Sequence, residues 1–289
     1  MMRSEEEMMK LILGFASEHD EIRAVVMNGS RVNPNAKKDP FQDYDVACYV
    51  TDVEPFRRKP EIVKYFGEIL ILQTPEDMDD PPPSKDGGYG YLMQFMDGNR
   101  IDLGFSPLEK LAEYLEDSLS LVLVDKDNRI GVIPPPNDRG YLPQKPTEKA
   151  FADCCNEFWW LNAYVAKSLW RDELTLAHYM FDAHLRDQLL KMLTWYFGVQ
   201  TDFQKAAGKH GKYLQDGIGE DLWKLLERTY ADAQPERAWE ALFVTGELFR
   251  KTALPVARSF GFDYPAEDDR KVSEYIRRIK KLPRDAKVI

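Results

Sequence analysis

Residues 22–50 read IRAVVMNGSRVNPNAKKDPFQDYDVACYV, and this stretch decides the fold of the first half of the chain. The apolar run over residues 22–27 predicts a buried strand that ends at the turn Gly29-Ser30. A polar loop rich in Asn, Pro and Lys follows, and residues 44–50 predict a second strand. The stretch therefore indicates two strands of one sheet-containing domain, joined by a long polar loop.

Three acidic residues lie on or beside predicted strands. Since side chains two apart on a strand point to the same face, Asp43 and Asp45 should present carboxylates about 6–7 Å apart to a shared site, with Tyr44 facing the other side. Residues 92–105 contain the turn Asp97-Gly98-Asn99 and predict a β-hairpin. Asp102 lies on the second arm of this hairpin.

The other elements of the first half complete a mixed sheet with flanking helices. Apolar residues at helical spacing predict helices over residues 4–18 and 107–117. Short apolar runs predict strands over residues 68–73 and 121–124. This mixture places the chain in the α+β class.

The composition changes at the loop Pro134-Pro135-Pro136-Asn137-Asp138, which cannot continue a helix or a strand. We place the domain boundary there, with an N-terminal domain over residues 1–138 and a C-terminal domain over residues 139–289. Apolar residues three and four apart predict that the second domain is an all-α helical bundle. Its expected helices cover residues 147–171, 173–197, 219–230, 236–259 and 267–281. All six tryptophans lie in this half and supply large side chains for its core.

The overall charge limits the class of partner. The chain has 289 residues, a formal net charge of -10 and a sequence pI near 5.1. Binding to nucleic acid needs a basic surface, so this balance disfavours a nucleic-acid partner. It suits a small cationic substrate instead.

Cysteine content and hydropathy indicate the compartment. The three cysteines are too few and too irregularly spaced for a disulfide framework or a zinc cluster, which fits a reducing cytosol. No uncharged apolar run approaches the ~20 residues needed to span a bilayer, and the charged N-terminus has no apolar signal core. We therefore expect a cytoplasmic protein with no membrane partner. The sequence carries no signal for the oligomeric state.

The neighbouring acids suit a magnesium site. Magnesium prefers oxygen ligands and completes its shell with substrate phosphates, so carboxylates without histidine or cysteine favour it. At the turn before the acids, Gly29 permits close approach of the backbone, and Ser30 offers a hydroxyl and an N–H to triphosphate oxygens. Arg31 would add positive charge there. The competing interpretation is that the Asp-x-Asp pair merely caps a turn or faces solvent.

These residues resemble the polymerase-β-like nucleotidyltransferase superfamily, whose pattern is Gly-Ser, a loop, Asp-x-Asp and a third acid. More narrowly, the chain is similar to bacterial aminoglycoside 6-adenylyltransferases over nearly its whole length. The runs that carry this resemblance are Met2-Arg3-Ser4-Glu5, Gly29-Ser30-Arg31, Phe41-Gln42-Asp43-Tyr44-Asp45, Val50-Thr51-Asp52-Val53-Glu54, Pro75-Glu76-Asp77-Met78, Asp97-Gly98-Asn99-Arg100-Ile101-Asp102-Leu103, Leu123-Val124-Asp125-Lys126-Asp127, Pro136-Asn137-Asp138-Arg139 and Asp153-Cys154-Cys155-Asn156-Glu157-Phe158-Trp159.

The resemblance implies transfer of AMP from ATP to the 6-hydroxyl of streptomycin, with release of pyrophosphate and resistance to the antibiotic. Asp43 and Asp45 would hold two magnesium ions about 4 Å apart. Asp102 would be either a third ligand or the base for the acceptor hydroxyl, and we favour the ligand role, which also orients the acceptor.

Three lysines of the second half are candidates for contact with the triphosphate. Lys167 lies near the end of the helix expected over residues 147–171. Lys209 and Lys212 lie in the loop Gly208-Lys209-His210-Gly211-Lys212-Tyr213, and the superfamily resemblance implies lysines from a second domain on the β and γ phosphates. The alternative is that Lys167 is solvated at a helix end and that the loop is an exposed turn.

A cationic acceptor would need carboxylates and aromatic faces. Glu157, Trp160 and Asp182 are the candidates in the helical half. An Asp182–Arg186 pair four residues apart also has an ordinary use in stabilising a helix, and this alternative stays open.

Two other functions compete with this assignment. One keeps the transfer reaction but uses a different small hydroxyl acceptor. The other is a non-catalytic protein that retains the nucleotidyltransferase fold for partner binding or nucleotide sensing. Intact acids at all three positions favour an enzyme.

Overall fold

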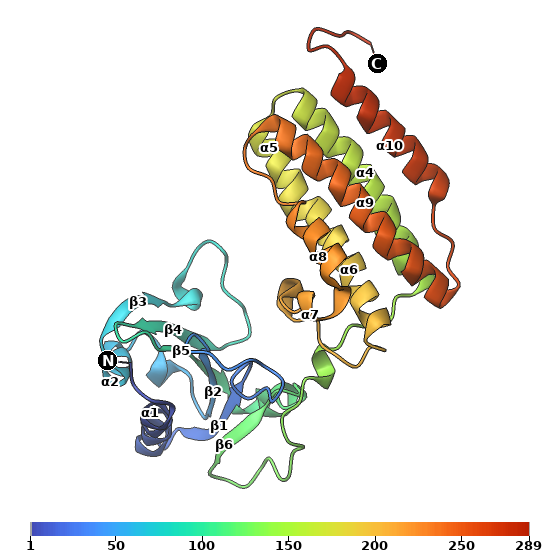
Figure 1. Cartoon of the computed structure of the whole chain (residues 1–289). Helices are drawn as coiled ribbons and strands as arrows, with labels where there is room; N and C mark the ends of the chain where they lie inside the picture. The colour runs from blue at the N-terminus through green and yellow to red at the C-terminus, as the bar shows by residue number, and fades with distance from the viewer. Residues whose placement is uncertain (1, 289) are drawn as a thin grey trace. The chain divides into compact units, whose positions relative to one another are not determined.

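The computed structural model describes residues 2–288, and its contacts divide the chain into two compact units that meet between Gly140 and Tyr141 (Figure 1). The first unit holds a mixed sheet with helices, and the second consists of helices and their connections. The α+β class expected from the sequence, with the sheet in the first half and a helical bundle in the second, is therefore confirmed.

The sheet has six strands within the described residues: β1 (Ile22–Asn28), β2 (Tyr44–Val50), β3 (Ile69–Gln73), β4 (Tyr89–Phe95), β5 (Arg100–Pro107) and β6 (Leu121–Asp125). Their order across the sheet is β3-β4-β5-β2-β1-β6. All neighbours run antiparallel except β2 and β5, which are parallel. Parallel strands need a long connection, and here it contains the β3 and β4 edge of the sheet.

One face of the sheet carries the main core of the first unit. Helices α1 (Glu5–Glu18) and α2 (Pro60–Phe66) pack against it and bury aromatic side chains between helix and sheet. Tyr44 and Val46 of β2 point into this core. Because side chains alternate along a strand, Asp45 between them faces away from the core.

The other face of the sheet is covered by a short helical segment. A 3-10 turn (Leu108–Lys110) leads into α3 (Leu111–Tyr114). Leu111 packs there against Ala24 and Tyr49 in a second, smaller apolar cluster. The sheet next to this cluster stays open, and the acids lie on that open part.

Two α-helices of the first unit differ from the sequence expectation. The continuous helix predicted over residues 107–117 is wrong in length, because the chain must turn back into β6 and the Asp117 carboxylate closes that turn by accepting the Leu119 N–H at 2.9 Å. Helix α2 was missed altogether. Its signals are Pro60 at the first helical position and Ile62 and Phe66 four residues apart on the buried side.

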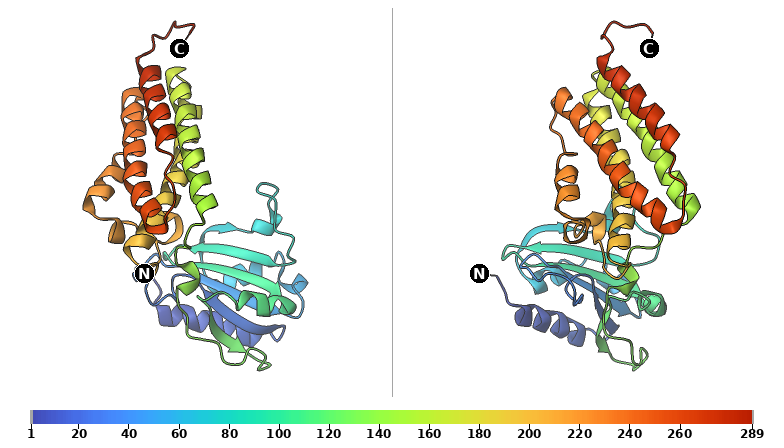
Figure 2. Two further views of the ribbon diagram at one scale, coloured as in Figure 1. Left: turned by 90° about the vertical axis from the view of Figure 1, so that its right-hand side faces the viewer. Right: turned by 45° about the vertical axis from the view of Figure 1, so that its right-hand side comes forward.

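The second unit contains helices α4 (Glu148–Trp170), α5 (Leu174–Tyr179), α6 (Arg186–Gln200), α7 (Gln215–Ile218), α8 (Glu220–Glu227), α9 (Pro235–Phe260) and α10 (Ala266–Lys281). A π-helical segment, Met180–Leu185, joins α5 to α6 without a break in the helical path. Both views of Figure 2 show the long helices α4, α9 and α10 side by side. The five helical stretches predicted from apolar periodicity are all present.

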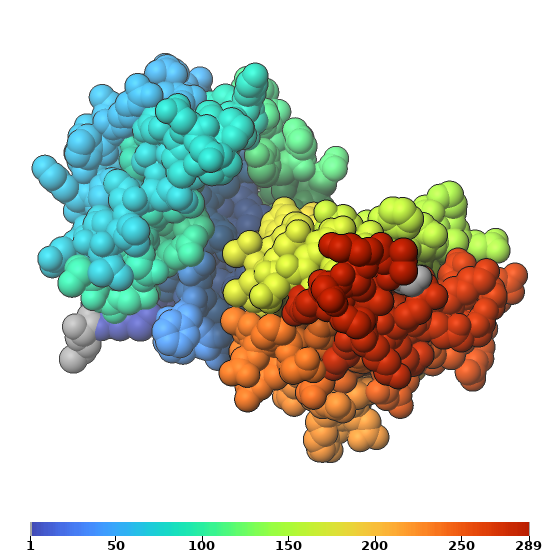
Figure 3. All heavy atoms as spheres, turned by 90° about the horizontal axis from the view of Figure 1, so that it is seen from above, coloured from blue at the N-terminus to red at the C-terminus, as the bar shows by residue number. Residues whose placement is uncertain are grey.

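The core of the helical unit is aromatic. Phe158 of α4 stacks on Phe249 of α9 with ring centroids 3.6 Å apart. At the other end of α4, the Trp170 Nε1–H donates to the Leu282 carbonyl at 3.0 Å, which ties the segment after α10 to α4. Figure 3 shows this last segment, in red, beside the yellow-green atoms of α4. None of the helices within residues 2–288 combines the length and apolar character needed to cross a membrane.

Candidate active site

Three carboxylates gather at one end of β2 and β5 because these two strands are parallel and in register. Asp45 lies directly opposite Asp102 in the strand pairing. Asp43 precedes Asp45 by two residues, and its carboxylate is close enough to interact electrostatically with both other acids. The sequence predicted each acid, and the parallel pairing supplies the contact between them.

Arg100 bridges the cluster and was not identified from the sequence. Its Nε and Nη2 each donate to one oxygen of Asp102 at 2.8 Å, and its Nε lies 3.6 Å from Asp43 Oδ2. The signal was its spacing, because Arg100 precedes Asp102 by two residues as Asp43 precedes Asp45. Parallel pairing therefore sets Arg100 beside Asp43, and the guanidinium neutralises part of the charge of the acids.

The carboxyl groups perturb one another. Burial, followed by the negative charges of Asp102 and Asp43, raises the pKa of Asp45 from 3.8 to about 6. Burial also raises the pKa of Asp43, although the Arg100 guanidinium opposes the rise. A cation placed among these groups would favour their charged forms and relieve the repulsion. Strongly perturbed acids in a hollow are a common property of functional sites.

Gly29 makes room for the Asp45 carboxylate. Its φ of +79° lies in the left-handed region, and a Cβ at this position would fall 2.1 Å from Asp45 Oδ2. Any side chain at residue 29 would therefore be strained and would also displace the acid. The adjacent Ser30 carbonyl accepts the Gln42 side-chain amide at 3.0 Å, which ties the turn after β1 to the segment leading into the acids.

Arg31 holds that same segment from the core side. Its Nη2 and Nε donate to the carbonyls of Gln42 and Asp43 at 2.5 and 3.3 Å. Its guanidinium lies over the Tyr44 ring, 3.8 Å from the centroid, and within 3.4 Å of Glu5. Arg31 would have to give up these contacts in order to bind a phosphate directly. The geometry therefore favours a role for Arg31 in positioning the segment that carries Asp43.

A shallow hollow of about 400 Å³ opens beside the acids on the face that α3 partly covers. Asp45 and Asp102 line one side, and Tyr114 and Asp117 line another. Its floor is bare backbone, since Gly104 pairs with Gly90 on β4 and with Ala47 on β2. Tyr114, Asp117 and the two glycines were not predicted from the sequence, because strand pairing brings the glycines to the acids and the packing of the α3 segment brings Tyr114 and Asp117.

The donor set fits magnesium in its chemistry. All three groups are carboxylates, which are hard oxygen ligands, and Arg100 already shows that the cluster accepts a cation. Within residues 2–288, no three His, Cys, Asp or Glu side chains enclose a ready-made metal site. A metal would therefore need further ligands from substrate or solvent, as magnesium usually does.

The sequence matches a known family over nearly its whole length. Residues 2–279 fit the family model described as streptomycin adenylyltransferase. The chain belongs to this family. It is 41% identical over 281 residues to the aminoglycoside 6-adenylyltransferase of Campylobacter jejuni, covering 97% of both chains, and 38% identical over 270 residues to that of Bacillus subtilis strain 168, covering 93% and 95%. A crystal structure of an aminoglycoside 6-adenyltransferase from Bacillus subtilis is 33% identical, with a TM-score of 0.48 over 97% of this chain and 100% of that chain.

The resemblance found in the sequence is thereby confirmed. The protein is an adenylyltransferase, an activity that implies ATP as co-substrate. The individual site residues stay predictions, and the structure shows only where each one lies.

The lysine candidates of this adenylyltransferase occupy different places in the helical unit. Lys167 is half-buried in the last turns of α4, where it lines a hollow of about 220 Å³ with Trp170 and Leu282. It lies 19 residues beyond Glu148, or roughly 28 Å along the helix axis. Lys209 and Lys212 are exposed on the 3-10 turn before α7, and the Lys212 ammonium lies 5.0 Å from the Tyr213 ring centroid. Lys167 and the 209–212 loop therefore lie in different segments of the helical unit and are surrounded by different residues.

The acceptor candidates also differ in their surroundings. Glu157 and Trp160 are three residues apart on the exposed side of α4, and Trp160 is 69% exposed, which leaves its ring free to stack on a ligand. Asp182 is already paired, with its carboxylate 3.1 Å from His178 Nδ1 and 2.8 Å from Arg186 Nη2. Arg186 is buried and also donates to Thr229. This favours the structural interpretation of the Asp182–Arg186 pair, although Asp182 keeps an exposed edge.

Replacing Gly29 by alanine should reduce turnover by about 100-fold, because the new methyl group displaces the Asp45 carboxylate. The matched control is Gly131→Ala. Gly131 has a similar φ of +68°, but a methyl group there would meet no atom within 4 Å, so the control carries the backbone strain alone. Steady-state adenylyl transfer by the two purified variants checks this, and equal rates would contradict the role of Gly29.

Replacing Asp45 by asparagine should stabilise the metal-free protein at pH 7 but not at pH 4. Because the folded-state pKa of Asp45 is raised to about 6, the folded chain binds a proton more tightly than the unfolded chain, and stability falls as the pH rises from 3.8 to about 6. Asp45→Asn removes this loss, on the order of 1 kcal/mol after solvent screening.

Hydrogen exchange of peptides from β2 and β5 measures this effect, with the exposed Asp79→Asn as control. We expect slower exchange in Asp45→Asn than in wild type at pH 7 and no difference at pH 4. A difference of the same size at both pH values would rule out titration of Asp45 as its cause.

Proposed function

We propose that this adenylyltransferase transfers AMP from magnesium-ATP to a hydroxyl group of an aminoglycoside, specifically the 6-hydroxyl of streptomycin. The reaction would release pyrophosphate and inactivate the antibiotic, so that the enzyme confers resistance. Membership of the streptomycin adenylyltransferase family supports the reaction class. The names of the relatives support the acceptor class and the position modified.

One observation carries the chemical part of the proposal. Asp45 and Asp102 lie side by side on a pair of parallel strands, and Asp43 interacts electrostatically with Asp45. The turn at Gly29 lies against the Asp45 carboxylate. A triphosphate bound at the turn would meet the Gly29 and Ser30 backbone on one side and the acids on the other. Its negative charge and theirs require a cation between them.

Asp43, Asp45 and Asp102 are the proposed ligands of two magnesium ions. When bound, the ions would offset the charge of the triphosphate and of the acids and favour loss of the acceptor proton. Asp102 would also orient the acceptor, since it faces the hollow as well as Asp45. Arg100 would hold Asp43 and Asp102 in position and release them in part when the metal binds, because both cations compete for the same oxygens.

The ATP contacts are proposed from charge and position. Gly29 and Ser30 would approach the triphosphate through the backbone, and Arg31 would act through the segment it holds. Lys209 and Lys212 are the exposed cations we favour in the helical unit, with Lys167 as a further candidate. Each ammonium would neutralise a phosphate oxygen.

The proposed acceptor contacts form two groups of residues. Tyr114 and Asp117 offer an aromatic face and a carboxylate beside the bare floor of the hollow. Glu157, Trp160 and Asp182 are the proposed contacts from the helices. Cationic aminoglycosides suit such groups because charge pairing and cation–π contact both favour a positive ligand.

Each half of the chain then has its own task. Residues 1–138 would form the catalytic nucleotidyltransferase domain, and residues 139–289 would form a helical domain that binds substrate and nucleotide. We propose that the enzyme acts in the cytoplasm, where ATP is present, and needs no nucleic-acid or membrane partner. The net charge of -10 supports a cationic substrate over nucleic acid.

Pyrophosphate release tests the function directly. Wild-type protein incubated with magnesium, ATP and a panel of aminoglycosides should release pyrophosphate with streptomycin, and Asp45→Asn should abolish the release while keeping the fold. Release with a different acceptor only would replace the proposed substrate. Absence of release with the whole panel would favour a non-catalytic protein, and wild-type activity of Asp45→Asn would refute its role as a ligand.

Asp117→Asn should raise the KM for the aminoglycoside by about tenfold while leaving kcat and the KM for ATP near wild type. The substitution removes the charge facing the hollow but keeps an oxygen that can accept the Leu119 N–H. The exposed Asp79→Asn serves as the control. An unchanged acceptor KM would remove Asp117 from the acceptor site.

A further inference from the structure

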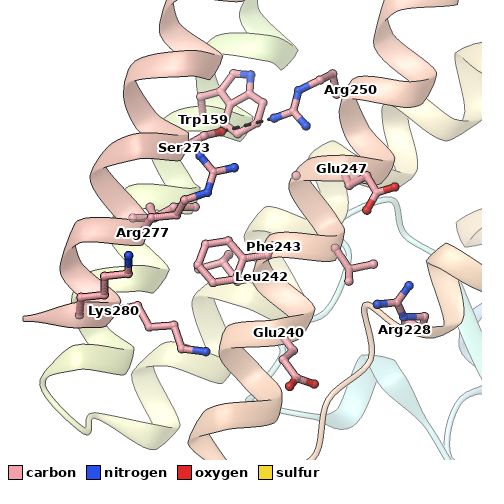
Figure 4. A pocket seen from close by; sticks show the side chains of 14 residues that line it. Trp159, Arg228, Glu240, Leu242, Phe243, Glu247, Arg250, Ser273, Arg277 and Lys280 are labelled. Atoms are coloured by element: carbon pink, nitrogen blue, oxygen red, sulfur yellow. Dashed lines mark hydrogen bonds between the residues drawn. The ribbon is translucent and has the colours of Figure 1, made fainter.

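A second, larger hollow lies wholly within the helical unit. It occupies about 790 Å³ and is lined mainly by α9 and α10, with Trp159 of α4 and Arg228 after α8 (Figure 4). Its volume lies within the range that small-molecule sites occupy. Nothing in the proposed transfer reaction uses it.

The floor of this hollow is aromatic, and a glycine keeps it open. Phe243 and the buried Trp159 contribute their rings. Gly246 lies in the interior of the 26-residue helix α9, where glycine weakens a helix relative to alanine. A Cβ at Gly246 would contact the Trp159 ring at 3.5 Å, an ordinary van der Waals distance. The position thus tolerates a small side chain, and its absence leaves an edge of the otherwise buried indole ring on the lining of the hollow.

The rim of the hollow is basic in an otherwise acidic protein. Five of the 14 lining residues are Arg or Lys and two are Glu, whereas the whole chain has a net charge of -10. Figure 4 shows Arg277 and Lys280 of α10 along one wall, with Glu240, Glu247 and Arg228 along the other. Positive charge is therefore concentrated on the α10 side.

Some of these basic side chains pair with acidic residues of the fold, and others have no such partner. Arg250 donates to both oxygens of the buried Asp269 at 2.6 and 2.5 Å, and Lys280 lies 3.0 Å from Glu236. Within residues 2–288, the side chains of Arg228, Arg277 and Lys281 take part in no hydrogen bond or ion pair. These three cations are available to a ligand.

We propose that this hollow is a binding site for a small anion that carries a flat ring. The ring would lie on Phe243 and the Trp159 edge beside Gly246, and the anionic group would meet Arg277 and Lys281, which are one helical turn apart on α10. A guanidinium and an ammonium so placed recognise phosphate or carboxylate oxygens.

The same walls argue against a larger polyanion. Glu240 and Glu247 line the wall opposite Arg277, so an extended chain of phosphates crossing the hollow would meet like charge. A compact ligand with its charge at one end avoids them. The site is independent of the proposed adenylyl transfer, because none of its residues belongs to the acid cluster.

Isothermal titration calorimetry on the full chain tests the site with two ring-bearing probes that carry their charge at one end, 1-naphthyl phosphate and 1-naphthoate. Neither contains a triphosphate, so binding does not report on the ATP site. We expect one equivalent of at least one probe to bind, and the tighter probe identifies phosphate or carboxylate as the preferred group. No heat from either probe at millimolar concentration overturns the proposal.

Matched variants locate the binding. Arg277→Gln should weaken the bound probe at least about tenfold, whereas Arg278→Gln, an exposed arginine one residue along α10 that does not line the hollow, should leave it unchanged. Gly246→Leu should also abolish binding by filling the floor. Equal affinity in Arg277→Gln and wild type overturns the proposal even if Gly246→Leu fails to fold. Tripolyphosphate binding as tightly as 1-naphthyl phosphate overturns it too, since the floor would then contribute nothing.

Discussion

The parallel pairing of β2 with β5 is the constraint on which the acid cluster depends. It places Asp45 opposite Asp102 and Asp43 beside Arg100, so that three negative groups and one positive group share one end of the sheet. A shift of the register by one residue would turn Asp102 toward the apolar core. The large core on the other face, to which α1, α2 and four of the strands contribute buried side chains, opposes such a shift and so holds the acids together against their mutual repulsion.

Much of the first unit follows from local sequence, while the surroundings of the acids do not. The apolar runs around Asp45 and the hairpin turn before Asp102 predict strands that the structure contains. Periodicity cannot reveal which segments are neighbours, so the positions of Arg100 and Gly104 beside the acids follow only from the sheet order, and that of Tyr114 follows from the packing of α3. The missed residues are those whose function depends on contacts between distant segments.

The helical unit shows a similar division. Apolar spacing predicts its long helices well, because each helix buries one face against the same aromatic core. The same spacing cannot say which charged residues are committed to the fold. Asp182 proves to be paired with Arg186 and His178, whereas Arg277 has no such partner within the described residues. The spacing of four residues thus offered the Asp182–Arg186 pair as one of two interpretations, and the contacts in the structure favour it.

The bare backbone beside the acids has a consequence for the evolution of this protein. At Gly104 a methyl group would meet no atom closer than 3.9 Å, and at Gly90 none closer than 3.5 Å, so either position accepts alanine without strain on the sheet. A single-base change in a glycine codon suffices for that replacement. Selection by a new drug could therefore reshape the floor of the hollow proposed for the acceptor, while the acids, the turn and Arg100 stay unchanged. The substrate range of such an enzyme can drift in small steps, each reversible and each compatible with continued catalysis.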